Sequence, residues 1–319
     1  MNDASGGAGD RALPWRGPGD GRPTDLPLPP AKLPLRRGGR WRKRWRYVGA
    51  FSEEILLCAA RVHVGPFQQS FWAVCDRAGD RMWEKTRLVL PGARGEVWTE
   101  HLGGEEVVAE LGDLGVLDYA PEEGSLVRID ADVRGPDDVR AFLRLTGGRW
   151  AESVCPTEGG QYTWTRKRAD VPVEIDVRVG DERWRTEGRA VEDESAGYHP
   201  KHTVWSWSAG VGRTTDGRSV GWNLVVGVND PPERSERSIW VDGTPTEPGP
   251  VTFHALEAIE FADGSRLDFA KEFERVRDEK RLGFKSSYRQ PFGTFGGSLP
   301  GGLELERGLG VMEFHDATW

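Results

Sequence analysis

Two adjacent carboxylates, two histidines, a tyrosine and two tryptophans lie in the stretch from Asp193 to Trp207, which reads DESAGYHPKHTVWSW. A carboxyl group packed against large aromatic rings is desolvated, which raises its pKa and lets it keep a proton near neutral pH. The same rings can bind apolar molecules. These residue types at this spacing therefore predict a site in which an acid acts on a hydrophobic ligand.

Asp193 and Glu194 are the candidate acids of this stretch. Neighbouring residues of a strand point to opposite faces, so only one of the two can face a pocket. An Asp193 side chain facing Trp205 or Trp207 could protonate an alkene or a leaving group, and the tryptophan faces could stabilise a carbocation. The alternative is a solvated pair of acidic side chains in a loop.

A second polar pair lies near the end of the sequence. Glu313 and His315 share one face of a strand, and Met312 and Phe314 share the other. If the polar face points into a barrel, both of its side chains need partners there. We therefore predict Glu313 and His315 as catalytic residues, with Asp193 and His315 as an acid/base pair. The alternative is an outward-facing polar surface.

Aromatic and amide side chains of two neighbouring strands are candidates for ligand binding. Trp205 and Trp207 are two residues apart and share a face, whereas Trp222 and Asn223 point to opposite faces. Asn223 could place a polar group in an apolar lumen, and Tyr198 could orient a ligand or cap the barrel mouth. The alternative for all of these side chains is ordinary packing in a core.

The sequence predicts neither a metal nor a cofactor. His199 and His202 flank a proline that favours an extended or turned backbone, which indicates hydrogen-bonding or loop roles for both histidines. Cys58, Cys75 and Cys155 lack metal-binding spacing, and we expect free, buried thiols in a reducing cytoplasm. No P-loop, HExxH or Gly-x-Ser-x-Gly motif is present.

The surrounding sequence consists of short runs rich in Val, Trp, Phe and Leu, separated by turn residues. This pattern is typical of antiparallel strands, and Arg77-Ala-Gly-Asp80 is typical of a hairpin turn. Strands are expected over residues 54–64, 70–76, 81–90, 96–101, 106–111, 115–119, 125–133, 162–167, 171–179, 183–191, 203–210, 219–229, 237–241, 252–261, 264–272, 274–284, 290–296 and 309–319. Only residues 136–145, which begin with Pro136 and two aspartates, are expected to be helical.

The strand spacing predicts an all-β fold built of two antiparallel β-barrels in tandem. We expect residues 1–37 to form an extended or disordered Pro/Gly-rich arm. Residues 38–160 would then form the N-terminal barrel, and residues 161–319 would form the C-terminal barrel.

The composition excludes several classes of protein. The 319 residues carry a formal net charge of -8, which argues against nucleic-acid binding. The basic run from Arg36 to Arg46, with Trp41 and Trp45 interleaved, is expected to be a solvated first strand or to pair with internal carboxylates. No run of 18 apolar residues predicts a membrane span, and the N-terminus lacks an apolar signal segment. A cytoplasmic protein is expected.

Residues 159–207 carry a pattern that resembles the entry to the second barrel of the AttH-like and carotenoid 1,2-hydratase group. A strand bearing Tyr162 precedes a Gly-x-Ala-x-x-Asp-x-x-x-Gly stretch at Gly188, Ala190, Asp193 and Gly197, and an aromatic strand follows. The resemblance implies that Tyr162 binds the ligand. In that group Asp, His and Trp-Gly stand where this chain reads DESAG, so the histidine beside the acid is absent here.

The sequence is identified as a member of the family named domain of unknown function 2804. The motifs that carry this resemblance are WRKRWRY at 41–47, DESAGY at 193–198, GWNLVVGVND at 221–230, QPFGTFGG at 290–297 and GVMEFHDATW at 310–319. The resemblance covers residues 15–319. It implies two tandem lipocalin-like barrels with a ligand cleft where they meet.

Three functions are open at this point. The leading hypothesis is binding of a hydrophobic small molecule, such as a lipid or an isoprenoid, in an aromatic cleft near the barrel junction. The second is a cofactor-free lyase or isomerase, in which Asp193 acts as the general acid of a hydration, cyclisation or isomerisation. The third is a structural or interaction protein whose tryptophans form the core.

Overall fold

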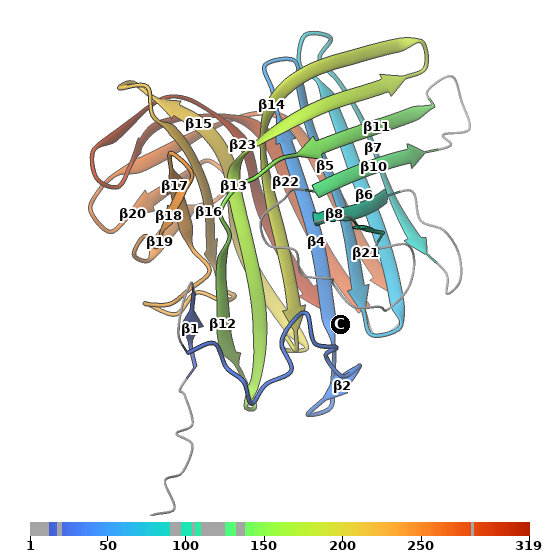
Figure 1. Ribbon diagram of the computed structural model, residues 1–319, viewed down its shortest axis with the longest axis vertical. Helices are drawn as coiled ribbons and strands as arrows, with labels where there is room; N and C mark the ends of the chain where they lie inside the picture. Colours follow the sequence, from blue (N-terminus) through green and yellow to red (C-terminus); the bar gives the residue numbers. More distant parts are fainter. Residues whose placement is uncertain are drawn as a thin grey trace, which may run out of the picture.

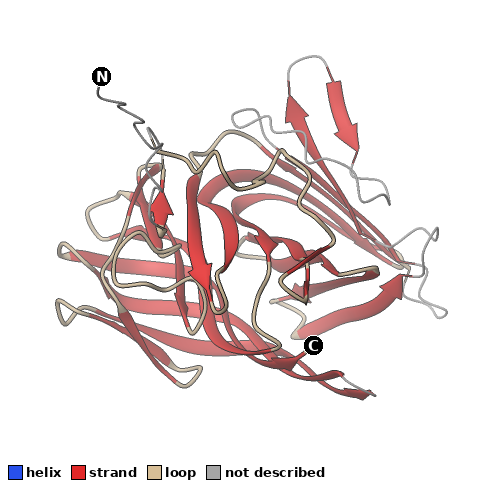
Figure 2. Ribbon diagram, turned by 90° about the horizontal axis from the view of Figure 1, so that it is seen from below, coloured by secondary structure: helices blue, strands red, loops and turns tan. Residues whose placement is uncertain are grey.

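The computed structural model describes residues 13–17, 21–89, 97–103, 106–109, 125–131, 138–281 and 284–319. Over these residues the chain forms strands and loops without a helix (Figure 2). The predicted all-β fold is therefore confirmed. The described part contains no helix that is long and apolar enough to cross a membrane.

The first sheet collects the strands before residue 198, all paired antiparallel, in the order β7-β6-β5-β4-β14-β13-β11-β10-β8-β9. Strand β12 adds to β13 and carries β1 on its other side. The strands are β1 (Trp15–Arg16), β4 (Lys43–Phe51), β5 (Ile55–Val64), β6 (Phe67–Asp76), β7 (Arg81–Val89), β8 (Val97–Gly103), β9 (Glu106–Ala109), β10 (Ser125–Ala131), β11 (Val139–Leu145), β12 (Ala151–Thr157), β13 (Gln161–Val179) and β14 (Glu182–Gly197).

The second sheet has the order β18-β17-β16-β15-β23-β22-β21-β20-β19 and is also antiparallel. Its strands are β15 (His202–Thr214), β16 (Ser219–Val226), β17 (Ser238–Val241), β18 (Thr244–Thr246), β19 (Val251–His254), β20 (Ala258–Phe261), β21 (Arg266–Arg281), β22 (Phe284–Leu299) and β23 (Leu303–Thr318). A small hairpin pairs β2 (Arg36–Arg37) with β3 (Arg40–Trp41).

Both sheets curl, and β4, β13 and β14 of the first lie against β15, β16 and β23 of the second (Figure 1). The chain passes from one sheet to the other between Gly197 and His202, at the end of the stretch that carries the candidate acids. The division into barrels at residue 160 and the count of two closed barrels stay predictions.

Alternation along the strands produces three apolar cores. On β4, Val48 and Ala50 point into the core of the first sheet, whereas Tyr47 and Phe51 point to the second sheet. The strands of the second sheet alternate in the same way. Trp222 and Leu224 of β16 point into the core of the second sheet, and Val225 points to the first sheet. Each sheet therefore buries one face in its own curl and the other in the contact between the sheets.

The two sheets approach each other closely at an irregularity of β13. The register shifts between Arg168 and Val171, where Asp170 has a φ of 58°. Opposite this bulge lies Gly221 of β16, whose added Cβ would stand 2.7 Å from the Ala169 Cβ and 2.8 Å from the Asp170 backbone nitrogen. A larger residue at Gly221 would push the sheets apart, so glycine is needed there.

The predicted helix over residues 136–145 is wrong, because residues 139–145 form β11. The alternation explains the difference, since Arg140, Phe142 and Arg144 are exposed while the apolar residues between them are buried: Val139, Ala141, Leu143 and Leu145. A period of two favours a strand over the helix that the preceding proline and aspartates indicated.

The predicted hairpin turn at Arg77–Asp80 is confirmed, since it joins β6 to β7 with Asp76 opposite Arg81. Two pairs of predicted strands join into single long ones: residues 162–167 with 171–179 in β13, and residues 264–272 with 274–284 in β21. Each long strand has a β-bulge near the point where the prediction ended one strand and began the next. The predicted strand at 115–119 lies outside the described residues.

The described part of the N-terminal arm packs on the first sheet. Leu28 and Leu33 are buried against a cluster that includes Tyr162 and Tyr198. The Tyr162 hydroxyl donates a hydrogen bond to the Pro27 carbonyl at 2.6 Å, and the Tyr198 hydroxyl donates to the Pro34 carbonyl at 2.7 Å. Two tyrosines that the sequence predicts as ligand contacts therefore hold the arm in place.

We expect the double substitution Tyr162→Phe with Tyr198→Phe to loosen the arm. Each change removes one hydrogen bond and leaves a carbonyl without its donor, which should lower the free energy of unfolding by about 1 kcal/mol per site. Trypsin should also cut faster after Lys32, which lies in the held segment. Urea unfolding and a proteolysis time course measure the two effects, and Thr186→Val, at an exposed hydroxyl, is the control. Unchanged cleavage would show that the hydroxyls do not hold the arm.

Candidate functional site

A cavity of about 620 Å³ lies between the two sheets. Side chains of β4–β7, β13 and β14 line one side, and side chains of β15, β16 and β21–β23 line the other. This size is usual for sites that bind small molecules. The wall is largely apolar, and its largest side chains are five tryptophans: Trp41, Trp45, Trp205, Trp207 and Trp319.

The cavity lies next to the packed apolar contact between the two sheets. On β23, Val311 packs in that contact, and Glu313 and His315 follow at intervals of two residues and line the cavity. Since every second side chain of a strand shares a face, burying Val311 directs both polar residues into this space. The predicted placement of Glu313 and His315 on one face, with Met312 on the other, is confirmed.

Glu313 is a buried carboxyl group with three hydrogen-bond donors. Its Oε1 accepts from Trp205 Nε1 at 2.8 Å, and its Oε2 accepts from the Tyr288 hydroxyl at 2.8 Å and from Gln290 Nε2 at 3.0 Å. Burial raises the pKa of Glu313 to about 7, although the hydrogen bonds from Tyr288 and Trp205 oppose the shift. The group can therefore exchange a proton near neutral pH.

Lys167 lies between two more buried carboxylates, Asp193 and Glu236. Its Nζ contacts Asp193 Oδ1 and lies 3.4 Å from Glu236 Oε1. Burial raises the pKa of both carboxyl groups, and the Lys167 ammonium acts in the opposite direction. Two carboxylates share one ammonium, so the cluster becomes electrically neutral when it binds a single proton.

Asp193 faces the cavity and Glu194 faces away, as the strand alternation predicts. Asp193 lies opposite Lys167 in the β13–β14 pairing and also accepts a hydrogen bond from the Trp45 side chain. Glu194 points into the first sheet, where its Oε2 accepts from Arg166 Nε at 2.7 Å. Only Asp193 is thus placed to meet a molecule in the cavity.

The loop after β16 brings Glu236 to this cluster. Asn229 Nδ2 donates to Glu236 Oε2 at 2.8 Å, and Asn223 Nδ2 donates to the Glu236 carbonyl at 3.1 Å. Asn223 also accepts from Trp207 Nε1 at 2.8 Å. Asn223 therefore joins the aromatic wall to the loop instead of pointing a polar group at the ligand.

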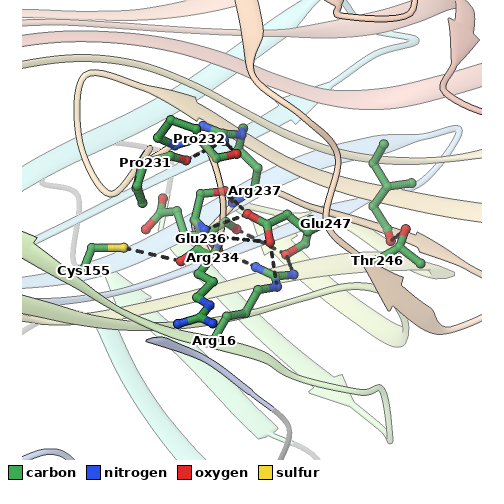
Figure 3. Close-up of polar contacts among 12 residues, drawn as sticks. Arg16, Cys155, Pro231, Pro232, Arg234, Glu236, Arg237, Thr246 and Glu247 are labelled. Atoms are coloured by element: carbon green, nitrogen blue, oxygen red, sulfur yellow. Dashed lines mark hydrogen bonds and ion pairs between the residues drawn. The ribbon is translucent and has the colours of Figure 1, made fainter. Parts of the chain in front are cut away.

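The N-terminal arm fixes the same loop from outside (Figure 3). Arg16 donates to the Ser235 carbonyl at 2.5 Å, and its Nε lies 3.8 Å from Glu247 Oε2. Within the loop, Arg237 Nη2 donates to the Pro231 carbonyl at 2.8 Å. These contacts place Glu236 in the cavity by holding the residues on either side of it.

His315 is a neutral base at the same end of the cavity as Trp319. Burial lowers the pKa of His315 to about 3, and the Lys43 ammonium adds to the effect. The ring centroid of His315 lies 4.4 Å from that of Trp205, and its Nε2 hydrogen-bonds to Ser286 Oγ at 2.7 Å. An imidazole without charge can accept a proton from water or from a ligand.

Arg275 brings a cation into the cavity from β21. Its Nε lies 2.7 Å from Glu84 Oε2, and its Nη2 donates to Thr86 Oγ1 at 3.0 Å, so it links the second sheet to β7 of the first. The guanidinium carbon lies 4.4 Å from the Phe71 ring centroid and 5.5 Å from that of Tyr288. Packing and ion pairing together fix its position.

The two histidines of the stretch from Asp193 to Trp207 lie in different environments. His199 is buried and its ring stacks on Trp45, with 4.8 Å between the ring centroids. His202 is exposed, and its Nε2 lies 2.8 Å from Asp316 Oδ1. Among the described residues, no group of three or more His, Cys, Asp or Glu side chains is arranged to hold a metal ion.

The structure brings five predicted site residues together and leaves four elsewhere. Asp193, Glu313, His315, Trp205 and Trp207 line the cavity. Tyr162 and Tyr198 hold the arm, Trp222 lies in the core of the second sheet with its indole donating to Ser208 Oγ at 3.1 Å, and Asn223 lies behind the wall. The catalytic and binding roles of all nine residues stay predictions.

Sequence reasoning missed Lys167, Glu236, Tyr288 and Arg275. For Lys167 a signal was present, because pairing the basic run TRKR with EDES across a hairpin sets cations opposite carboxylates. Arg275 and Tyr288 lie among alternating charged residues of β21 and β22, and nothing in that pattern distinguishes the cavity side from the solvent side.

Fold and site together define an all-β protein with two curled antiparallel sheets and buried carboxyl groups in an aromatic cavity. The chain belongs to the family described as Domain of unknown function (DUF2804), which it matches over residues 27–319. No curated protein sequence matches it.

The solved structures to which the chain is similar are distant in sequence. Kievitone hydratase from Nectria haematococca is 9% identical, with a TM-score of 0.52 over 87% of this chain and 89% of that one. An AttH protein from Nitrosomonas europaea is 13% identical, with a TM-score of 0.45 over 86% and 92%. CghA with Sch210972 is 9% identical, with a TM-score of 0.42 over 96% and 98%. The likeness to the hydratase shows the fold alone.

We expect Glu313 to make stability fall with rising pH. The carboxyl group titrates near 4.5 when unfolded and near 7 when folded, so between these values the unfolded chain has released a proton that the folded protein keeps. The Glu313→Gln variant lacks this titration. From pH 4.5 to pH 8, the wild type should therefore lose about 3 kcal/mol of unfolding free energy relative to the variant.

Urea unfolding of both proteins at several pH values in this interval measures the difference. Glu304→Gln, at an exposed position of the same strand, is the control and should follow the wild type. Parallel curves for wild type and Glu313→Gln would show that Glu313 titrates as a solvated carboxyl group.

Proposed function

We propose that this protein binds a hydrophobic small molecule, of the lipid or isoprenoid class, in the cavity between its two sheets. The observation that carries the proposal is the 620 Å³ space walled by aromatic and aliphatic side chains of both sheets. A water-filled apolar cavity of this size is unfavourable, and an apolar ligand that displaces the water gains the hydrophobic free energy of the wall.

The mouth of the cavity supports this proposal. Phe67 and Leu88 line the cavity and are 63% and 48% exposed. Phe67 follows the turn after β5, and Leu88 lies near the end of β7, so the two apolar side chains mark the rim. Apolar side chains at a rim suit a ligand that arrives from an apolar environment.

N-phenyl-1-naphthylamine, an uncharged fluorescent probe of apolar sites, tests the proposal. We expect saturable binding with one probe per chain and a marked increase in emission. Val62→Trp, which adds a large side chain to the cavity wall, should weaken binding at least tenfold, because a tenfold change corresponds to about 1.4 kcal/mol of lost contact.

Val276→Trp is the matched control. Val276 lies between cavity-lining residues of β21, but its own side chain is 50% exposed on the other face of the strand. This variant should bind the probe as the wild type does. Absence of saturable binding, or equal binding by Val62→Trp, would favour a structural or interaction role without a small ligand.

The carboxyl groups of the cavity favour a second function, a cofactor-independent hydratase, cyclase or isomerase with Asp193 as general acid. In a hydration, the proton of the Asp193 cluster would move to an alkene carbon, water would add to the resulting cation, and neutral His315 would accept the proton that the water releases. The faces of Trp205 and Trp207 would stabilise the cation. The raised pKa of Asp193 supports its role as the acid, and the lowered pKa of His315 keeps the imidazole uncharged, so that it can accept a proton from the strongly acidic oxonium formed when water adds to the cation.

Linear isoprenoid alkenes incubated in ¹⁸O-labelled water test this second function. We expect hydrated products with one labelled oxygen by mass spectrometry, or isomers of unchanged mass. Asp193→Asn should abolish product formation while the naphthylamine probe still binds, because the amide keeps the shape and lacks the acidic proton. Asp268→Asn, at an exposed position, is the control. Product formation that survives Asp193→Asn would exclude Asp193 as the acid.

A further inference from the structure

Arg275 is a buried cation with an unused donor. The residue is 2% exposed and lines the cavity. The Nε–Glu84 ion pair and the Nη2 hydrogen bond to Thr86 engage one edge of the guanidinium. Nη1 is buried and has no hydrogen-bond partner among the described residues. A buried donor left without an acceptor costs free energy, so such a group in a binding cavity is a candidate contact for a ligand.

The Tyr47 hydroxyl is a second buried group of this kind. Tyr47 also lines the cavity, and its hydroxyl has the Cys58 thiol beside it but no nitrogen or oxygen of the described residues as a hydrogen-bond partner. Its ring packs edge-on against Trp207, with 5.2 Å between the ring centroids. Tyr47, Ala60, Phe71 and Thr86 lie opposite one another in a row across β4–β7, and Arg275 contacts Phe71 and Thr86 of this row, which places the two donors in the same part of the cavity.

The surroundings suit an anionic oxygen at this point. Phe71 and Tyr288 present ring faces to the guanidinium and exclude competing acceptors from those sides. The cavity carboxyl groups already have donors of their own: Trp205, Tyr288 and Gln290 for Glu313, Lys167 for Asp193 and Glu236, and Arg277 for Glu279. An incoming carboxylate would therefore complete the contacts of Arg275 without taking a donor from another group.

We propose that Arg275 Nη1 and the Tyr47 hydroxyl bind the carboxylate of an amphipathic acid whose apolar part fills the aromatic cavity. This inference rests on the proposed function and adds the polar end of the ligand. The guanidinium supplies charge and a fixed donor direction, and the phenol supplies a second hydrogen bond. A ligand of the same length without a charge would leave Nη1 without an acceptor.

Dodecanoate and dodecanol, which share a chain length and differ in charge, test the proposal by displacing the naphthylamine probe at pH 8. We expect wild-type protein to bind dodecanoate about tenfold or more tightly than dodecanol, as is usual for a hydrogen bond to a charged group. Arg275→Gln should reduce this ratio to about one while the affinity for dodecanol and for the probe stays the same. Tyr47→Phe should reduce the ratio in part.

Arg289→Gln is the matched control, since Arg289 lies on β22 with a half-exposed side chain and pairs with Glu274 outside the cavity. It should keep the wild-type ratio. If Arg275→Gln does not fold, Arg275→Lys keeps the charge beside Glu84, removes the guanidinium fork and should lower the ratio.

The outcomes separate the two proposals. Equal binding of dodecanoate and dodecanol by the wild type, or a ratio that survives both Arg275→Lys and Tyr47→Phe, overturns the carboxylate site. Failure of the probe itself to bind overturns the proposed function instead.

Discussion

The structure depends on the burial of both faces of each sheet where the two sheets meet. One face of a strand such as β4 packs in the core of its own sheet, and the other face packs against the partner sheet. Because the side-chain period of a strand is two, no residue on such a strand can avoid one of these environments. Any polar residue on the contact face must find a partner in that contact or face the cavity.

This constraint accounts for the electrostatics of the site. Lys167, Asp193 and Glu313 lie on contact faces, so their charges are removed from water and satisfied by one another or by indole, phenol and amide donors. Desolvation then sets the direction in which the carboxyl pKa values move, and the donors limit the size of the shift. The shifted pKa values of these carboxyl groups are therefore explained by burial of the strand faces on which they lie.

Alternation also decides what the sequence could reveal. It predicted that only one of Asp193 and Glu194 could face a pocket, and that Glu313 and His315 share a face, because these statements concern neighbours on one strand. It could not reveal that Arg275 or Glu236 joins them, since that depends on how the sheets pack and on how the arm holds the loop. The helix predicted over 136–145 was wrong because the proline and the two aspartates at its start, which are typical of the first turn of a helix, were given more weight than the alternating pattern of the residues that follow.

The polar side chains of the cavity argue for a ligand with a polar part. A site that held only hydrocarbon would be more stable with apolar residues at Lys167, Glu236 and Arg275, because a buried charge contributes less than apolar packing of equal volume. Stability is commonly given up where function requires it. This reasoning supports the proposal that the unused donor on Arg275 and the carboxyl groups with raised pKa contact the polar atoms of a ligand.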